Sequence, residues 1–167
     1  ANAAALADLQ EKLAAEGVSM NTILVPMAAQ VLTDKLPAHA PVADYAAILQ
    51  VLTDAGVDTT DVFFTLAAHS SENIYYRTDH HWTQLGAYYA YTAFCEAAGF
   101  EAVPLDAFET GRYDRFVGSM YNFTANYPQS QTLLDNPDYL EYYLPIATTH
   151  AKYYADANLE NGVPVSV

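Results

Sequence analysis

The feature that most limits the fold of this chain is a repeated exchange of helical and strand-like patterns in its first part. The stretch "AALADLQEKLAAE", residues 3–15, carries apolar residues at helical spacing and is followed by Gly17, a typical helix end. The run "MNTILVP", residues 20–26, is short, apolar and closed by a proline, which is typical of a buried parallel strand. A second helix over residues 42–56 and a second strand near residues 61–64 repeat the pattern. This alternation predicts an α/β layer structure with parallel strands, whose ligands usually bind beyond the carboxyl ends of the strands.

The size and charge of the chain limit the kinds of partner that it can bind. At 167 residues and 52% hydrophobic content, it fits one domain with a sizeable core. Lys and Arg number 6 against 20 Asp and Glu, and the net charge of -14 repels phosphate backbones and anionic membrane faces, so nucleic acid is not expected as a partner. No apolar run approaches the roughly 20 residues of a membrane span, and the start does not resemble a signal peptide. The lone Cys95 excludes an internal disulfide, which fits either a reducing compartment or an extracellular bacterial protein.

We expect residues 1–167 to form a single domain that is truncated at both ends, because the chain begins without a methionine and ends on the strand-like alternation "NGVPVSV". Residues 104–167 are rich in turn formers and aromatics and are predicted to form a β-rich excursion or insertion. Strand-like pieces lie at residues 139–145 and 150–156 and are interpreted as a hairpin or part of that excursion. Their tyrosines favour strands with a half-buried face, although such patches can also stack on sugars.

A cluster of chemically active residues lies in "YYRTDHHWTQLGAYYAY", residues 75–91. An imidazole acts as a general base when one ring nitrogen faces the nucleophile and the other donates to a carboxylate. Asp79 and His81 are spaced so that the acid can meet Nδ1 and leave Nε2 free, with His80 pointing elsewhere and Trp82 walling the site. The alternative is that Asp79 caps the following helix and the histidines are solvated or packed residues of its first turn.

A metal site is a third interpretation, because imidazole and carboxylate are common ligands for zinc and iron. Adjacent histidines rarely aim at one ion. The remaining histidines, His39, His69 and His150, form no H-x-x-x-H or H-x-H pattern. We therefore expect no metal and no other cofactor.

The residues after the motif have helical periodicity up to Gly99, and Thr83 is a suitable N-cap. The motif is thus expected on a loop that enters a helix. One face of that helix is apolar and aromatic: Trp82, Leu85, Tyr89 and Ala93.

The motif, together with "LVPMAAQVLTDKLP" some fifty residues earlier, resembles the bacterial DHHW protein family over roughly residues 20 to 125. That family is similar to the alginate O-acetyltransferases of the SGNH hydrolase superfamily, whose Asp-x-His-Trp segment carries the acid and base of a Ser-His-Asp triad. The resemblance implies a three-layer α/β/α fold with a mainly parallel sheet. It also implies a secreted or surface-anchored protein.

Carried over residue by residue, the resemblance makes His81 the base and Asp79 its orienting acid. Arg77, His80 and Trp82 become residues that flank the site without assigned chemistry.

The chain departs from this family at the nucleophile. In the relatives a serine lies on a Gly-Ser or Asp-Ser turn well downstream of the histidine, and no Asp-Ser string occurs here. Ser119 in "VGSMY" follows a glycine in a predicted loop and is a weak nucleophile candidate, whose alternative interpretation is a turn serine. Truncation, natural loss of activity and a different nucleophile compete as explanations, and the abrupt ends favour truncation.

Two functions from different classes follow. In the first, the complete protein is an SGNH-like esterase or O-acetyltransferase that acts on a cell-surface polysaccharide or another acyl acceptor. It is expected to need no cofactor and to receive its acyl group from a membrane acyl-transfer partner. In the second, the chain is a catalytically inactive module or scaffold that binds glycans through its 14 tyrosines.

Overall fold

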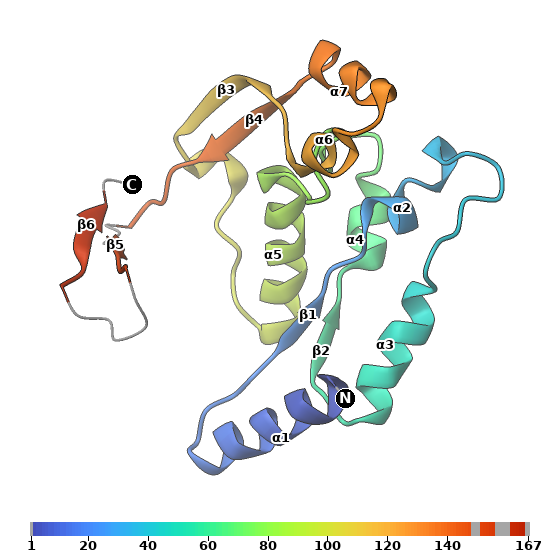
Figure 1. The fold of residues 1–167 in the computed structure, drawn as a ribbon. Helices are drawn as coiled ribbons and strands as arrows, with labels where there is room; N and C mark the ends of the chain where they lie inside the picture. Colours follow the sequence, from blue (N-terminus) through green and yellow to red (C-terminus); the bar gives the residue numbers. More distant parts are fainter. Residues whose placement is uncertain (1, 148–150, 156–160, 166–167) are drawn as a thin grey trace.

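The first half of the fold is built around one pair of parallel strands. The computed structural model describes residues 2–147, 151–155 and 161–165 (Figure 1). Strand β1 (Thr22–Leu24) pairs in parallel with β2 (Thr59–Asp61). The helix between two parallel neighbours is the usual crossover of an α/β unit, and the predicted α/β class is confirmed.

Helices surround this strand pair, and Figure 1 shows α3 and α5 on opposite sides of it. Helix α5 begins at the predicted N-cap, because Thr83 Oγ1 accepts a hydrogen bond from Gly86 N at 3.2 Å. It ends where Gly99 adopts a left-handed conformation with φ of 73°, as the sequence indicates. The elements of this half are α1 (Asn2–Ala15), α2 (Ala28–Val31), η1 (Thr33–Lys35), α3 (Tyr45–Asp54), α4 (Phe63–Ala68) and α5 (Gln84–Ala98).

The core lies where α2, α4 and α5 meet. Val62, Leu66 and Ile74 have no exposed surface, and burying an aliphatic side chain of this size stabilises a fold by roughly 1.5–3 kcal/mol. The predicted apolar face of α5 packs against this cluster, and its members are those expected: Trp82, Leu85, Tyr89 and Ala93. The apolar face therefore fixes the start of α5, and with it the loop that carries the motif.

The second half of the chain contains antiparallel pairs. Strand β3 (Thr110–Phe116) pairs with β4 (Asp138–Tyr143), and β5 (Ala151–Tyr153) pairs with β6 (Val163–Val165). The β3–β4 pairing is irregular at Arg115, which has a positive φ of 62°. Short helices precede or separate the first pair: η2 (Leu105–Ala107), α6 (Ser119–Thr124), η3 (Pro128–Ser130) and α7 (Gln131–Asp135). A separate unit beginning at residue 104 stays a prediction.

Several local predictions are wrong. The second strand is placed at Thr59–Asp61 rather than at residues 61–64, because Asp61 Oδ1 accepts from Phe63 N at 2.9 Å and turns the chain into α4. Strand β1 is half-buried rather than buried. The strands at 139–145 and 150–156 do not pair with each other, since each has another partner.

The described helices give no candidate for a membrane span. Within residues 2–147, 151–155 and 161–165, none is both long and apolar enough to cross a bilayer.

Candidate active site

The motif forms a short loop whose two ends are joined by backbone hydrogen bonds. Tyr75 and Trp82 form an antiparallel bridge, and Tyr76 N donates to the carbonyl of His81 at 3.3 Å. Thr83 N donates to Ile74 O at 2.9 Å as the chain enters α5. These bonds hold residues 77–80 in a loop directly before the start of α5.

Asp79 and His81 are in direct contact on this loop. Asp79 Oδ1 lies 2.5 Å from His81 Nδ1 and also accepts a hydrogen bond from His81 N at 2.9 Å. The Asp79 side chain is 9% exposed, whereas the His81 side chain is 64% exposed. Among the described residues no hydrogen bond occupies His81 Nε2. A largely buried acid thus orients an exposed imidazole whose second nitrogen can reach a substrate or nucleophile.

The second oxygen of Asp79 is held from a distant part of the chain. Ser119 N donates to Asp79 Oδ2 at 2.8 Å. Burial opposes ionisation of Asp79, but hydrogen bonds from Ser119 and His81 outweigh it and hold the pKa of this carboxyl well below its usual value. Asp79 is therefore a carboxylate at neutral pH. It does not cap α5, since Thr83 has that role.

Gly118 permits this contact. A Cβ atom added at residue 118 would lie 2.3 Å from the Cβ of Asp79 and 2.5 Å from its Oδ2. The backbone of Gly118 is extended, so the requirement for glycine is steric rather than conformational.

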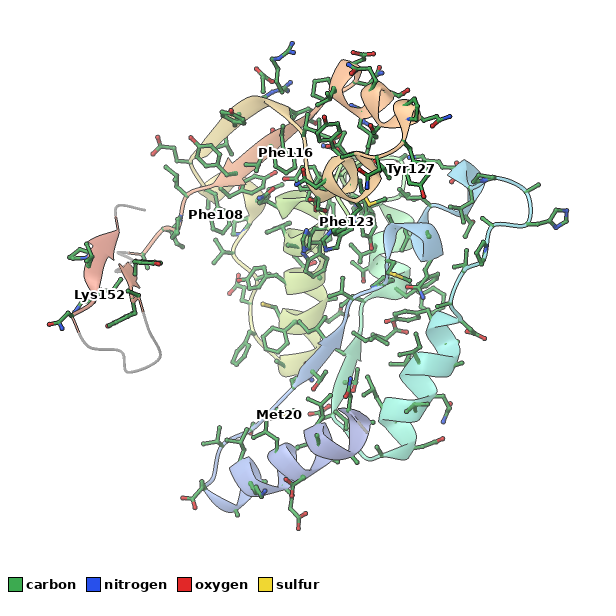
Figure 2. The ribbon with its side chains drawn as sticks, viewed as in Figure 1. Met20, Phe108, Phe116, Phe123, Tyr127 and Lys152 are labelled. Atoms are coloured by element: carbon green, nitrogen blue, oxygen red, sulfur yellow. The ribbon has the colours of Figure 1, made fainter. Side chains whose placement is uncertain are left out.

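His80 does not point away from the site, contrary to the prediction. Its Nδ1 lies 2.5 Å from Ser119 Oγ and 3.9 Å from Asp79 Oδ1, and its ring centroid is 3.8 Å from that of His81. The ring of Phe123 on α6, labelled in Figure 2, has its centroid 5.8 Å from that of His80. The reason is that α6 packs against the loop, an arrangement that the local sequence does not encode.

The other predicted site residues have structural contacts. Trp82 packs against the hydrophobic core. Arg77 donates from Nε to Asp138 Oδ1 at 3.0 Å and from Nη2 to Pro137 O at 2.9 Å. Ser119 does not lie in a loop but is the first residue of α6.

Three residues of the loop could bind a metal ion. The possible ligand atoms of Asp79, His80 and His81 all lie within 4.8 Å of one another. An ion bound to His81 would occupy a ring nitrogen that the acid–base pair uses, so a metal and the acid–base pair exclude each other.

Sequence reasoning missed two residues that support the site, Thr78 and Asp138. Thr78 is fully buried, and Asp138 is 5% exposed. Asp138 Oδ2 accepts from Thr78 N and Thr78 Oγ1, both at 2.7 Å. No periodicity or motif marks this contact, because its partners are 60 residues apart.

Solved structures with the same fold define the class of protein. The chain is similar to a DHHW family protein from Eubacterium siraeum, with 31% identity and a TM-score of 0.72 over 96% of this chain and 55% of that one. It is also similar to the O-acetyltransferase domain of Pseudomonas putida AlgJ, with 27% identity and a TM-score of 0.69 over 87% and 56%. Bacillus cereus PatB1, with 20% identity and a TM-score of 0.61 over 87% and 51%, shares the fold. The class is an SGNH hydrolase-like α/β domain, as the resemblance predicts.

The family follows from the sequence. Residues 1–159 match the family described as ALGX, the SGNH hydrolase-like domain of acetyltransferase AlgX, and the chain belongs to this family. The chain spans about half the length of the solved relatives that it matches. Among curated proteins none matches it.

Proposed function

We propose that this chain supplies the acid–base pair of an SGNH-type O-acyltransferase or esterase. The observation that carries the proposal is the 2.5 Å contact between Asp79 Oδ1 and His81 Nδ1, with Nε2 left available. In this role Asp79 fixes the tautomer of His81 and stabilises the imidazolium that forms during the reaction.

The proposed reaction has two acyl-transfer steps. A serine hydroxyl from outside these 167 residues attacks the acyl carbonyl and gives its proton to His81 Nε2. The tetrahedral intermediate collapses, and His81 returns the proton to the leaving group of the donor. A sugar hydroxyl, or water in an esterase, then loses its proton to His81 and attacks the acyl-enzyme, and the serine oxygen leaves with that proton.

Ser119 is the weaker nucleophile candidate. Its hydroxyl faces His80 rather than His81, and the same nitrogen of His80 also faces Asp79. A triad needs the serine and the acid on opposite ring nitrogens. The Ser119–His80 contact lacks that arrangement, which favours a serine elsewhere in the complete protein.

The proposed substrate is a cell-surface polysaccharide, and the proposed location is secreted or surface-anchored. Both rest on the family and on the O-acetyltransferase domain among its relatives. A membrane protein that delivers the acyl group is the proposed partner of a transferase of this kind.

Labelling with a fluorophosphonate serine probe tests the proposal. The complete protein and this chain are each labelled, as the parent and as His81→Asn, with His39→Asn as a matched control because His39 is exposed and has a positive φ that asparagine tolerates. We expect labelling of the complete protein only, lost in His81→Asn and retained in His39→Asn. Equal labelling of His81→Asn and parent would refute the role of His81. Labelling of this chain that is lost in Ser119→Ala would assign the nucleophile to Ser119.

A glycan-binding module is the second candidate, favoured by one surface feature. A hollow of about 350 Å³ is lined by residues of α5 and by Phe108. Phe108 is labelled in Figure 2. Aromatic rings that line a hollow can stack on sugars. Calorimetric titration with surface polysaccharide distinguishes the candidates, since binding without any probe labelling of the complete protein would favour the module. The hollow is lined by Gln84, Ala87, Tyr88, Tyr91, Phe108 and Tyr143.

A further inference from the structure

A buried carboxylate holds the loop of the acid–base pair from the opposite side. Asp138 is the first residue of β4, and its side chain is 3% exposed. Its Oδ2 accepts from Arg77 N at 3.0 Å and from Thr78 N and Thr78 Oγ1 at 2.7 Å, and its Oδ1 accepts from Arg77 Nε at 3.0 Å. All four contacts go to the two residues that directly precede Asp79.

Thr78 also fixes the position of Ser119, whose backbone N–H donates to Asp79. Thr78 Oγ1 accepts a hydrogen bond from Gly118 N at 3.1 Å, and Thr78 O accepts one from Met120 N at 3.0 Å. Both neighbours of Ser119 are therefore tied to Thr78. Because Ser119 N is the donor to Asp79 Oδ2, the position of that donor depends on Thr78, and the position of Thr78 depends on Asp138.

We propose that Asp138 is a positioning residue for the Asp79–His81 pair, a proposal that rests on the proposed function. Pairing of β4 with β3 uses backbone groups and does not require an acid at residue 138. What the acid provides is a single oxygen that accepts three donors of the loop at once. Asparagine cannot reproduce this set of hydrogen bonds. If its amide oxygen took the place of Oδ2, its amide nitrogen would take the place of Oδ1 and would face Arg77 Nε, which is also a donor.

The first test uses this chain without a substrate. The ¹⁵N shifts of the His81 ring report which nitrogen carries the proton, and the signals are assigned by their loss in His81→Asn. We expect the parent to hold its proton on Nδ1, facing Asp79, and both Asp138→Asn and Thr78→Val to move toward the Nε2–H form. Thr78→Ser keeps the hydroxyl and should restore the parent pattern.

The controls separate positioning from folding. Asp114→Asn is the matched control, because Asp114 also pairs with an arginine, at 2.7 Å from Arg112 Nε, but its side chain is 69% exposed. Backbone spectra establish that each variant is folded. If Asp138→Asn does not fold, Thr78→Val decides, since it keeps the shape of threonine. A folded Thr78→Val or Asp138→Asn with the parent tautomer would overturn the proposal.

The second test uses the complete protein. Per probe-labelled active site, we expect kcat of Asp138→Asn to fall by about 10- to 100-fold with little change in KM, as for a misplaced catalytic group. A purely structural role would reduce the number of active sites and leave kcat per site unchanged, which would contradict the proposal. If His81→Asn left activity intact, the proposed function would fail, while the tautomer measurement would still test the positioning by Asp138.

Discussion

Replacement of Gly118 by alanine is the sharpest test of how the site is built. The new Cβ would lie 2.3 Å from Asp79 Cβ, so the two segments must separate by roughly 1 Å to reach ordinary van der Waals contact. Because the backbone of Gly118 is already extended, alanine adds no conformational strain. We expect overpacking to lower the free energy of unfolding by about 1–3 kcal/mol. If the proposed dyad is catalytic, a displacement of this size at its orienting carboxylate should cost roughly 100-fold in rate.

Two assays separate these effects. Urea unfolding of this chain measures stability, and the rate of fluorophosphonate labelling of the complete protein measures reactivity. Gly17→Ala is the control, because Gly17 has a φ of 73° and free space around its Cβ position, so alanine should cost about 1–2 kcal/mol of stability without reaching the site. Loss of labelling in Gly118→Ala alone is expected. Parent-like labelling in Gly118→Ala would refute the reasoning that Asp79 needs this close contact with residue 118.

Three further outcomes are expected. Asp79→Asn in the complete protein should lower the rate of probe labelling by about 10⁴-fold, since asparagine favours the wrong tautomer of His81, and a change below tenfold would contradict this. The folded-state pKa of Asp79 is lowered, so its contribution to stability is fully present above the unfolded-state pKa of about 4 and is lost as pH falls from there through the folded-state pKa. In urea unfolding, the difference in unfolding free energy between parent and Asp79→Asn should therefore stay constant from about pH 7 to about pH 5 and shrink below about pH 4. Leu66→Ala should lower the free energy of unfolding by about 2–5 kcal/mol in urea, against about 0.5 or less for the 46% exposed Leu9→Ala, and equal costs would show that the core is misassigned.

Local sequence rules predict those parts of the site that are built from neighbours. Thr83 and Gly99 mark the two ends of α5 because capping depends on the few residues around each end. The contact between Asp79 and His81 was predictable for the same reason, since two residues of separation already restrict where the side chains can meet. The α/β class follows from the alternation of periods in the first part of the chain.

Contacts between distant segments were not predictable from one sequence. Asp61, the last residue of β2, accepts a hydrogen bond from Tyr45 OH at 2.8 Å, a partner 16 residues away. His80 turns into the site because Ser119, 39 residues later, offers its hydroxyl. In both cases tertiary packing brings a polar side chain to its partner, and the local periodicity of the sequence does not predict which residue that partner is.

The distant contacts also change how the part of the chain after residue 104 is understood. Its composition of turns and aromatics favours an excursion from the α/β layers, and excursions are often dispensable. Yet Ser119 from α6 holds one oxygen of Asp79, and Asp138 from β4 holds the residues just before it. Asp79 precedes residue 104, but its orientation depends on residues that follow residue 104 as well as on His81. If the dyad is catalytic, the segment from β3 to β4 is part of the active site.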